Sequence, residues 1–439
     1  MITTVLDPVA RAAAVAEAQC IPATCRIGLL GLGNVGAAFA RHTREAASHL
    51  GARGFLPIVA TALVRSTARP RPAASFVTAV TSDVEAFFAE PVDVVVEALG
   101  GVEPAYSFVR RALDRGIPVV TANKSLIAAH GEELVQLARR RATALRFEAS
   151  CIAGVPFLGQ FERRPLAARA TGVTAILNGT SNSILTAMTS GATFAAALAD
   201  AQRLGFAEPD PTMDVSGADA AEKLAILVRL FGRLLLDPAA VPLDSLARVD
   251  PEDIAIAGAF DGAIRPIAHA SWHGRAVHAF AGPAFVGGTH PLARVSGVTN
   301  GIVIAAAPAP ICLTGPGAGP GVTADTLLDD VAELVAERRV RTPPPEPSQP
   351  AASVTRPHTA WFLRVNAGTG TREADVADLL GSYGIWSTRM TRRDGRIYLL
   401  TCAASYGRAQ SAFDALQAAT GAAVAAFPAV GAGGEDAAC

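Results

Sequence analysis

The stretch CRIGLLGLGNVGAAFARHTREAA, residues 25–47, decides how the first part of the chain folds. Its apolar start is typical of a buried strand, and the segment after the last glycine is typical of a helix. Between them Gly31, Gly33 and Gly36 permit a tight turn, a close approach of backbone to a pyrophosphate, and close packing of helix on strand. Asn34 and Val35 open the helix, where free amides attract phosphate. The stretch predicts a dinucleotide site; the alternative is a glycine turn that serves packing alone.

The residues around this turn alternate between strand-like and helix-like patterns. Short apolar runs at 56–64, 93–99 and 117–122 predict further strands, and segments 106–116 and 130–142 predict helices between and after them. Such alternation predicts a doubly wound, mostly parallel sheet of the Rossmann type. We assign residues 25–159 to this nucleotide-binding domain, after an N-terminal extension at 1–24.

The end of the second predicted strand bears on the choice of cofactor. An acidic residue there would hold the 2′-hydroxyl of NAD, but this strand ends in Val64-Arg65-Ser66, with Arg69 and Arg71 beyond. Arginine suits a 2′-phosphate, so the sequence favours NADP(H) over NAD(H), with Arg65 as the contact. The alternative is a solvated basic loop. Glycines of two other loops are also predicted to approach the cofactor: Gly100, Gly317 and Gly319.

The rest of the chain predicts two more units. Residues 160–300 combine helices with a strand-rich portion and are assigned to an α/β substrate-binding and dimerisation domain. A glycine loop and helix at about 301–340 are expected to return to the nucleotide-binding domain. The proline-rich segment 341–357 predicts a linker. Residues 358–430 follow a βαββαβ pattern, with a hairpin at Asp394-Gly395, which predicts a small ferredoxin-like domain before a tail at 431–439.

Composition narrows the classes of partner and compartment. The formal charge is −1 and only 18% of residues are charged, which gives no electrostatic case for binding nucleic acid or an anionic membrane. The N-terminus lacks the basic start of a signal peptide, and no apolar run approaches the length of a membrane span. The six cysteines show no repeated spacing, so we expect reduced thiols and a cytoplasmic protein.

The two lysines of the chain, Lys124 and Lys223, stand out because every other basic side chain apart from histidine is arginine. Lys223 follows Asp219 at i+4 within an apolar helical pattern, which places both on one helix face. The ordinary interpretation is a surface salt bridge worth a few tenths of a kcal/mol. Lysine, however, can release a proton near neutral pH and arginine cannot, so we predict that Lys223 is a proton donor in carbonyl reduction. The histidines at 269, 273 and 278 compete for this role, but their strand-like segment gives them a structural interpretation.

Seven motifs in one order resemble homoserine dehydrogenase, which interconverts aspartate 4-semialdehyde and homoserine. They are GLGNVG (31–36), VVVEALGGVEPA (94–105), VVTANKSLIA (119–128), FEASCIAGVP (147–156), ILNGTSNSIL (176–185), LGFAEPDPTMDVSGADAAEKL (204–224) and GPGAG (315–319). The resemblance implies that Lys223 donates the proton, that Asp219 assists it, and that Lys124 lies at the nicotinamide and the substrate. It implies a substrate pocket made by Glu208, Asp214, Asp219, Thr180, Gly179 and Gly205.

The resemblance also implies a bound monovalent cation, usually Na⁺. Its ligands would be Glu148 and the backbone carbonyls of Cys151, Ala153 and Val155. Two residues depart from the family pattern: Ile152 in the cation loop and Ser183 after NGTSN, where an aromatic residue is usual.

Family members pair through the substrate domain, so a homodimer or homotetramer is expected. The C-terminal unit takes the place of the family's regulatory ACT domain, but NAGTGTREAD (366–375) lacks the usual Asp-x-Pro-Gly signature. Two alternatives remain. One is a related dehydrogenase of another amino-acid semialdehyde; the other is a catalytically inactive NADP-binding regulatory protein.

Overall fold

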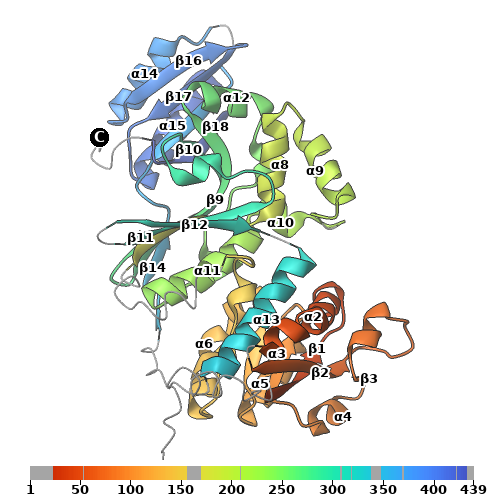
Figure 1. Ribbon diagram of the computed structural model, residues 1–439. Helices are drawn as coiled ribbons and strands as arrows, with labels where there is room; N and C mark the ends of the chain where they lie inside the picture. The colour runs from red at the N-terminus through yellow and green to blue at the C-terminus, as the bar shows by residue number, and fades with distance from the viewer. Residues whose placement is uncertain are drawn as a thin grey trace, which may run out of the picture.

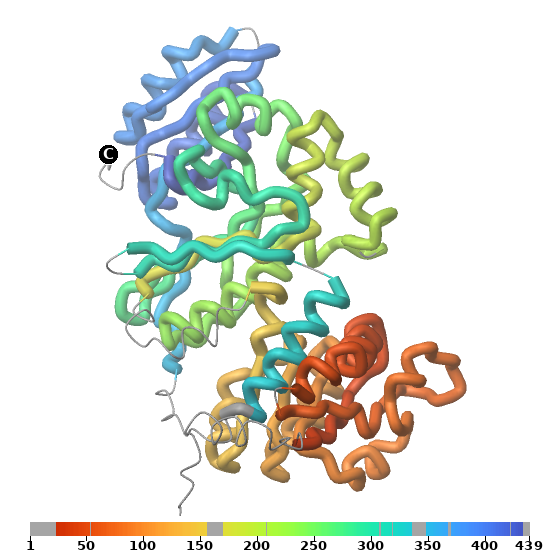
Figure 2. Tube along the Cα trace, in the orientation of Figure 1, coloured from red at the N-terminus to blue at the C-terminus, as the bar shows by residue number. Residues whose placement is uncertain are grey.

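The computed structural model describes residues 23–52, 54–155, 170–207, 209–306, 309–317, 319–337, 348–367, 370–421 and 423–432. Figures 1 and 2 show three regions stacked along one axis: a first sheet with its helices, a central sheet, and a C-terminal group of strands and helices. The chain passes from the first region to the second and returns once, through helix α13 (Pro320–Glu337). The chain's two lysines, one from each of the first two regions, contact one shared carboxylate near the junction between these regions.

The first region is a six-stranded parallel sheet in the order β3-β2-β1-β4-β5-β6. This is the order of a dinucleotide-binding doubly wound sheet and confirms the predicted fold class. Its strands are β1 (Ala23–Leu30), β2 (Phe55–Leu63), β3 (Ala79–Thr81), β4 (Val94–Glu97), β5 (Val119–Thr121) and β6 (Leu145–Arg146). Its helices are α2 (Asn34–Glu45), α3 (Ala47–Ala52), α4 (Val84–Ala89), α5 (Ala105–Asp114) and α6 (Lys124–Arg140).

The alternation of side chains along β1 explains why helices cover both faces of this sheet. Ile27 and Leu29 point to one face and pack with Phe39 of α2 and Leu327 of α13. Leu30 points to the other face, where it joins the core made by α4, α5 and α6. Each of these side chains is fully or almost fully buried, so the strand is held by apolar burial on both sides.

The second region is built on a mixed sheet of ten strands in all. Its path runs β12-β11-β7-β9-β10-β18-β15-β17-β16, and β14 (Ser353–Thr355) pairs with β10 off this path. The strands of the central part are β7 (Ala170–Ile176), β9 (Gly262–His273), β10 (Ala276–Gly287), β11 (Thr299–Ala306) and β12 (Ile311–Pro316). Its helices are α8 (Gly179–Thr189), α9 (Phe194–Arg203), α10 (Thr212–Ser216), α11 (Ala218–Gly232) and α12 (Pro251–Ala259).

One predicted boundary needs correction. Residues 301–316 were expected to return to the nucleotide-binding domain, but β11 and β12 belong to the central sheet, where β11 pairs with β7. Sequence periodicity does not reveal which distant strand is the partner. Only α13 makes the predicted return, since its Leu327 and Val331 lie in the same core as Ile27. The division of the chain into domains otherwise stays a prediction.

The C-terminal region has the predicted βαββαβ order. It consists of β15 (Ala360–Val365), α14 (Glu373–Ser382), β16 (Ser387–Arg393), β17 (Arg396–Thr401), α15 (Tyr406–Thr420) and β18 (Val424–Val430). The strand order β16-β17-β15-β18, with antiparallel neighbours, is ferredoxin-like, and the hairpin turns at Asp394 and Gly395 as predicted. An ACT-like function for it stays untested.

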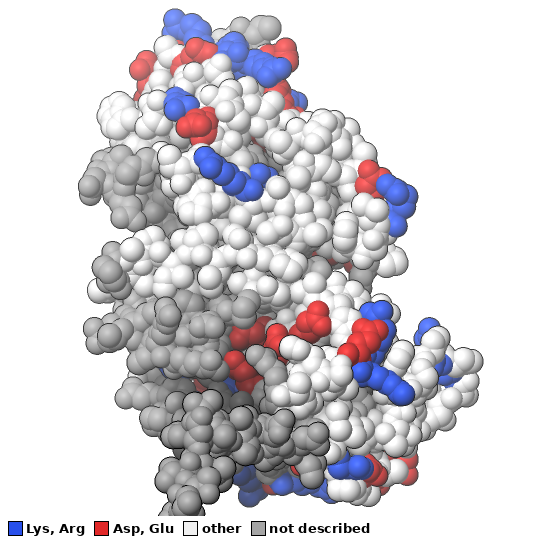
Figure 3. All heavy atoms as spheres, in the orientation of Figure 1, with Lys and Arg blue, Asp and Glu red and all other residues white. Residues whose placement is uncertain are grey.

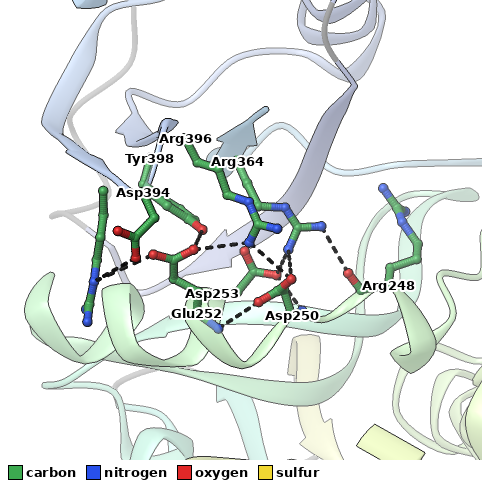
Figure 4. Close-up of polar contacts among 9 residues, drawn as sticks. Arg248, Asp250, Glu252, Asp253, Arg364, Asp394, Arg396 and Tyr398 are labelled. Atoms are coloured by element: carbon green, nitrogen blue, oxygen red, sulfur yellow. Dashed lines mark hydrogen bonds and ion pairs between the residues drawn. The ribbon is translucent and has the colours of Figure 1, made fainter. Parts of the chain in front are cut away.

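The C-terminal strands do not form a separate sheet. β18 pairs in parallel with β10 at two positions, so both regions share one continuous sheet. Phe362 of β15 stacks on Phe285 of β10, with ring centroids 5.7 Å apart, and both lie in one apolar core. A charged cluster, drawn in Figure 4, adds to this contact: Arg364 and Arg396 of the C-terminal strands reach acidic side chains at the start of α12. The accessory unit is therefore packed firmly on the central region.

The predicted linker is extended where it is described. Its last part forms β13 (Gln349–Pro350), which pairs with β8 (Leu234–Leu235), and then β14. The predicted N-terminal extension lies outside the described residues apart from 23–24, and so does most of the predicted tail. Cys402 is disulfide-bonded, which departs from the expectation of reduced thiols. Within the described residues, no helix is both long enough and apolar enough to cross a membrane.

Candidate active site

The glycine turn has the geometry that a pyrophosphate requires. Gly31 has a φ of 97°, and a Cβ there would lie 2.8 Å from the carbonyl oxygen of Ala98. A Cβ on Gly36 would clash with the carbonyl of Gly31. A Cβ on Gly33, by contrast, would meet no atom within 4 Å. Two glycines are thus needed for packing, and the third leaves open space beside the backbone.

The helix that follows presents unused donors to this space. Gly33 is the N-cap of α2 and supplies no side-chain hydrogen bond to the helix's first amides, which include those of Asn34 and Val35. Free amides at a helix N-terminus, next to room for a ligand, fit a pyrophosphate group. The residues present therefore fit the dinucleotide that the sequence predicts.

Other predicted cofactor residues lie in open backbone positions. Gly100 has a φ of 75° and Gly319 a φ of 127°, and a Cβ on either would meet nothing within 4 Å. Gly317 is packed differently, because a Cβ there would lie 2.5 Å from the Cγ of Asn300. In the loop after β2, Arg71 is engaged with backbone carbonyls, whereas Arg65 is exposed and makes no ion pair or hydrogen bond in the described part of the chain.

The centre of the site is one carboxylate shared by the two lysines. Lys124 Nζ lies 3.0 Å from Asp219 Oδ1, and Lys223 Nζ lies 2.9 Å from Asp219 Oδ2. Lys124 begins α6 in the first region, whereas Asp219 and Lys223 lie on the first turns of α11 in the second. The three groups are mostly shielded from water, with 34%, 8% and 14% of the Lys124, Asp219 and Lys223 side chains exposed. A chain of charges therefore crosses the junction between the two regions.

The electrostatics keep the shared group ionised. Burial alone would raise the pKa of Asp219, but the ammonium groups of Lys223 and Lys124 outweigh it and hold that pKa well below its usual range. Burial likewise works to lower the pKa of Lys124, but the carboxylates of Asp219 and Glu222 outweigh it, so this pKa is raised. Lys124 is therefore a fixed cation at neutral pH.

Asn178 links the predicted substrate acids. Its side-chain amide donates to Asp214 Oδ1 at 2.7 Å and to Asp219 Oδ2 at 2.8 Å, while its Oδ1 accepts from the Ser181 amide and caps α8. Burial raises the pKa of Asp214, an effect that the hydrogen bond from Asn178 opposes. Lys223 Nζ is fixed further by donating to the carbonyl oxygen of Leu177 at 2.8 Å. One short turn after β7 thus orients both the acids and the lysine.

The remaining predicted pocket residues surround this turn. Thr180 is the second residue of α8 and donates to the carbonyl oxygen of Phe206 at 2.5 Å. Gly179 fits closely, since a Cβ there would lie 2.8 Å from the carbonyl oxygen of Val298. Gly205 has a φ of 77° at the end of α9. Glu208 lies outside the described residues, so its predicted role is untested.

The predicted cation loop contacts two helices, α13 through Asp330 and α11 through Lys223. The Glu148 amide donates to Asp330 Oδ2 at 3.2 Å, and both acids are buried. Burial, reinforced by the charge of Glu148, raises the pKa of Asp330 well above its ordinary value. Cys151 Sγ lies 3.8 Å from the carbonyl oxygen of Lys223, and burial raises the pKa of this thiol to about 12. Ala153 and Val155 follow in the same buried loop.

The turn before Lys124 depends on a carboxylate that sequence reasoning missed. Glu97, fully buried at the end of β4, accepts from the Thr121 hydroxyl and, at 2.7 Å, from the Leu99 amide. The Asn123 side chain donates to Glu97 Oε1 and caps α6 by accepting from the Leu126 amide. Burial raises the pKa of Glu97. This network fixes where α6, and with it Lys124, begins.

Sequence signals for the missed residues were weak. An asparagine before a helical segment indicates an N-cap, which could have found Asn178 and Asn123. Nothing local marks Asn178 as the bridge between two acids, because that contact joins segments far apart in the sequence. Glu97 ends a continuous apolar run and gives no sign of its hydrogen-bond partners.

The fold and the site together define a dehydrogenase that uses a nicotinamide dinucleotide, because an open glycine turn follows β1 and a lysine–carboxylate pair able to move a proton includes Lys124, which follows β5. Comparisons with known proteins agree. A family model for homoserine dehydrogenase matches residues 156–332, and one for the homoserine dehydrogenase NAD binding domain matches residues 31–148.

Curated relatives and solved structures support the same family. The homoserine dehydrogenase of Mycobacterium tuberculosis (strain ATCC 25618 / H37Rv) is 36% identical over 358 residues, covering 77% of this chain and 80% of its own length. That of Synechocystis sp. is 35% identical over 321 residues, covering 71% and 73%. A homoserine dehydrogenase structure from Thiobacillus denitrificans has a TM-score of 0.83 at 29% identity, covering 94% of this chain and 99% of that one.

A hyperthermophilic archaeal homoserine dehydrogenase in complex with NADPH has a TM-score of 0.59 at 25% identity, covering 72% and 98%. The chain belongs to the homoserine dehydrogenase family, which consists of NAD(P)-dependent oxidoreductases. The resemblance predicted from the seven motifs is confirmed.

Proposed function

We propose that the chain catalyses the reversible reduction of aspartate 4-semialdehyde to homoserine with NADP(H). The single observation that carries this proposal is the Asp219 carboxylate held between Lys124 and Lys223 at 3.0 and 2.9 Å. Reduction of an aldehyde needs a hydride at carbon and a proton at oxygen. The dinucleotide, when bound, supplies the hydride, and the residues of this site supply the proton and its placement.

Lys223 is the proposed proton donor. Its ammonium group is directed by Asp219 and by the Leu177 carbonyl, which leaves one of its three N–H bonds for a substrate oxygen. In the forward direction this N–H proton passes to the aldehyde oxygen as the hydride arrives at the carbon. In reverse, the neutral amine accepts the hydroxyl proton of homoserine.

Lys124 is proposed to orient the reacting carbonyl as a fixed cation. Its raised pKa makes it a poor proton source but a stable partner for an oxygen that gains negative charge in the transition state. Asp214 and Asp219, with Glu208, are proposed to hold the substrate ammonium group, and Thr180, Gly179 and Gly205 to shape the pocket around it.

The preference for NADP(H) over NAD(H) is supported by the loop after β2. Arg65 is exposed and unengaged in the described part of the chain, so its guanidinium is available to a 2′-phosphate. An archaeal family member has been solved in complex with NADPH. The strand itself ends without an acidic residue that would favour a free 2′-hydroxyl.

A monovalent cation, Na⁺ in the first instance, is proposed in the loop of Glu148, Cys151, Ala153 and Val155. The buried Glu148 and Asp330 lie close enough for the charge of one to raise the pKa of the other, and a cation nearby would relieve that repulsion. We further propose that the enzyme acts in the cytoplasm as a homodimer or homotetramer.

A steady-state assay tests the proposed function. The purified chain, with aspartate 4-semialdehyde, is expected to consume NADPH with a higher kcat/KM than NADH. A panel of other amino-acid semialdehydes tests substrate specificity, since Ser183, whose hydroxyl donates to the Thr180 carbonyl at 2.8 Å, stands where the family pattern has an aromatic ring. Higher kcat/KM on another semialdehyde, or NADPH binding without consumption, would overturn the proposal.

A further inference from the structure

The two helices that carry the lysines are joined by contacts beyond the shared carboxylate. One turn along α11 from Asp219, the carboxylate oxygens of Glu222 lie 3.2 and 3.1 Å from the hydroxyl of Ser125 on α6. Further along, Ile226 of α11 is 1% exposed and belongs to the apolar core that contains Ile127 of α6. The charge of Glu222 also acts on Lys124, whose pKa it helps to raise.

Arg229, two turns beyond Glu222 on α11, makes the last of these contacts with α6. Its side chain is buried, with the residue only 7% exposed, and its Nη1 donates to the carbonyl oxygen of Ile127 at 3.2 Å. Its Cζ lies 5.4 Å from the centre of the Phe147 ring. Burial lowers the pKa of Arg229 to about 10, so it remains charged at neutral pH.

Gly131 is the reason Arg229 fits. A Cβ on Gly131 would lie 2.6 Å from the Cζ of Arg229 and 2.7 Å from its Nη2, so the guanidinium occupies the place of a side chain on α6. Glycine in a helix interior costs about 1 kcal/mol relative to alanine. Here that cost is offset because the Arg229 guanidinium of α11 can lie directly against the backbone of α6 at Gly131.

These contacts follow the same order on both helices. Lys124 meets Asp219, Ser125 meets Glu222, and Ile127 and Gly131 meet Arg229. The helices therefore leave the site side by side and in the same sense. If α6 slid or rolled on α11, the contact between Lys124 and Asp219 would change, but the contacts of Glu222 and Arg229 with α6 would break as well.

We propose that the seam formed by Ser125, Glu222, Ile127, Gly131 and Arg229 positions Lys124 over Asp219, and that Glu222 and Arg229 are positioning residues for the reaction. The inference rests on the proposed function for its kinetic consequence. Lys124 is the first residue of α6, so the placement of its backbone is set by how α6 sits on α11. Misplacing a group at a reacting centre by about 1 Å can cost about 100-fold in rate.

The variant Gly131→Ala tests the seam with little risk to folding. The new methyl group would displace the end of a flexible arginine side chain rather than backbone, and alanine favours a helix. We expect a melting temperature near that of the wild type, a nearly unchanged KM for NADPH, and a kcat about tenfold lower. In an Arg229→Met background the same substitution should change kcat less than twofold, because the displaced group is gone.

A second readout does not depend on activity. With only two lysines in the chain, protein labelled with ¹⁵N-lysine gives two lysine amide signals, and Lys223→Arg assigns them. Gly131→Ala and Glu222→Gln should each shift the Lys124 signal. Glu133→Gln is the matched control: Glu133 is exposed on α6 and bonded to Tyr106, so its neutralisation should leave both kcat and the Lys124 signal unchanged.

The outcomes separate the two proposals. A wild-type protein that fails to reduce aspartate 4-semialdehyde overturns the proposed function, and the seam is then judged on the Lys124 signal alone. An unmoved Lys124 signal in Gly131→Ala overturns the seam, and so does a kcat within twofold of an active wild type. An equal loss in the Arg229→Met background would also overturn it, because the effect would not pass through Arg229.

Discussion

Asp219 is the residue on which the site depends most. Its two oxygens hold lysines from two regions of the molecule, and its pKa is lowered because those ammonium groups outweigh its burial. A carboxylate whose folded pKa is lowered adds stability above its unfolded pKa, near 3.8, and this stability is lost as pH falls through the folded value. The contribution is therefore fully present at neutral pH.

Asp219→Asn should remove this counterion and leave Lys124 and Lys223 facing one another. We expect kcat to fall by about 100-fold and the free energy of unfolding at pH 7 to fall by about 3 kcal/mol, as when one partner of a buried pair is removed. Chemical denaturation and steady-state kinetics measure the two effects. An Asn variant as stable and as active as the wild type would show that the shared carboxylate is unimportant.

Sequence reasoning predicted part of this site at the residue scale. Helical spacing paired Asp219 with Lys223, and the scarcity of lysine singled out Lys124. The contact between Lys124 and Asp219 could not be predicted from spacing, because it joins helices 95 positions apart in the chain, at residues 124 and 219. Asn178 was missed for the same reason: its role lies in a tertiary contact.

At the scale of elements, the glycines of the turn after β1 have different roles: Gly36 serves packing, and Gly33 leaves room for a ligand. Gly36→Ala would clash with the Gly31 carbonyl and is expected to cost about 3 kcal/mol of folding free energy. Gly33→Ala would meet no protein atom, and the φ of −83° at this position suits alanine. It should leave stability unchanged but weaken NADPH binding at least tenfold, because the methyl group would occupy the space beside the backbone. Urea unfolding and NADPH titration of both variants measure this contrast, and equal effects on the two properties would contradict it.

Elements were predicted best where their signals are local. Apolar runs identified β2, β4 and β5, and the Asp-Gly pair identified the hairpin of β16 and β17, where both residues have positive φ. The assignment of β11 and β12 failed because pairing with β7 is a long-range choice. The extended linker that contains β14 was predicted, but the pairing of β14 with β10 was not.

At the scale of the whole molecule, the C-terminal unit is tied to the centre by the cluster in Figure 4. Arg364 lies 2.5 Å from Asp253 and 3.9 Å from Asp250, and Arg396 lies 3.1 Å from both Asp250 and Glu252. Figure 3 shows charged side chains of both signs gathered on the C-terminal region, whereas the visible face of the central region next to it is mostly uncharged. This docking depends on contacts between the C-terminal strands and α12, which lie far apart in the chain. The sequence therefore predicts an accessory domain but not how it packs on the central region.

Asp253 makes this docking sensitive to pH. It is fully buried, and burial raises its pKa to about 6 even though Arg364 lies beside it. A raised folded pKa means that stability is fully present below the unfolded value, near 3.8, and is lost as pH rises through about 6. The wild type should therefore lose up to about 3 kcal/mol relative to Asp253→Asn between pH 4 and pH 7.

Unfolding free energies across that pH range measure the difference. Asp378→Asn, which removes the same charge from an exposed position on α14 outside this cluster, is the matched control. A constant difference between wild type and Asp253→Asn would mean that Asp253 does not titrate in this window.

The central claim, that Lys223 moves the proton, is tested most directly by the kcat of Lys223→Arg for reduction of aspartate 4-semialdehyde with NADPH. Arginine can keep the contacts to Asp219 and to the Leu177 carbonyl but cannot release a proton. We predict that NADPH binding and the melting temperature stay close to the wild type while kcat falls by about 100-fold to 10,000-fold. A kcat within tenfold of the wild type would contradict the assignment.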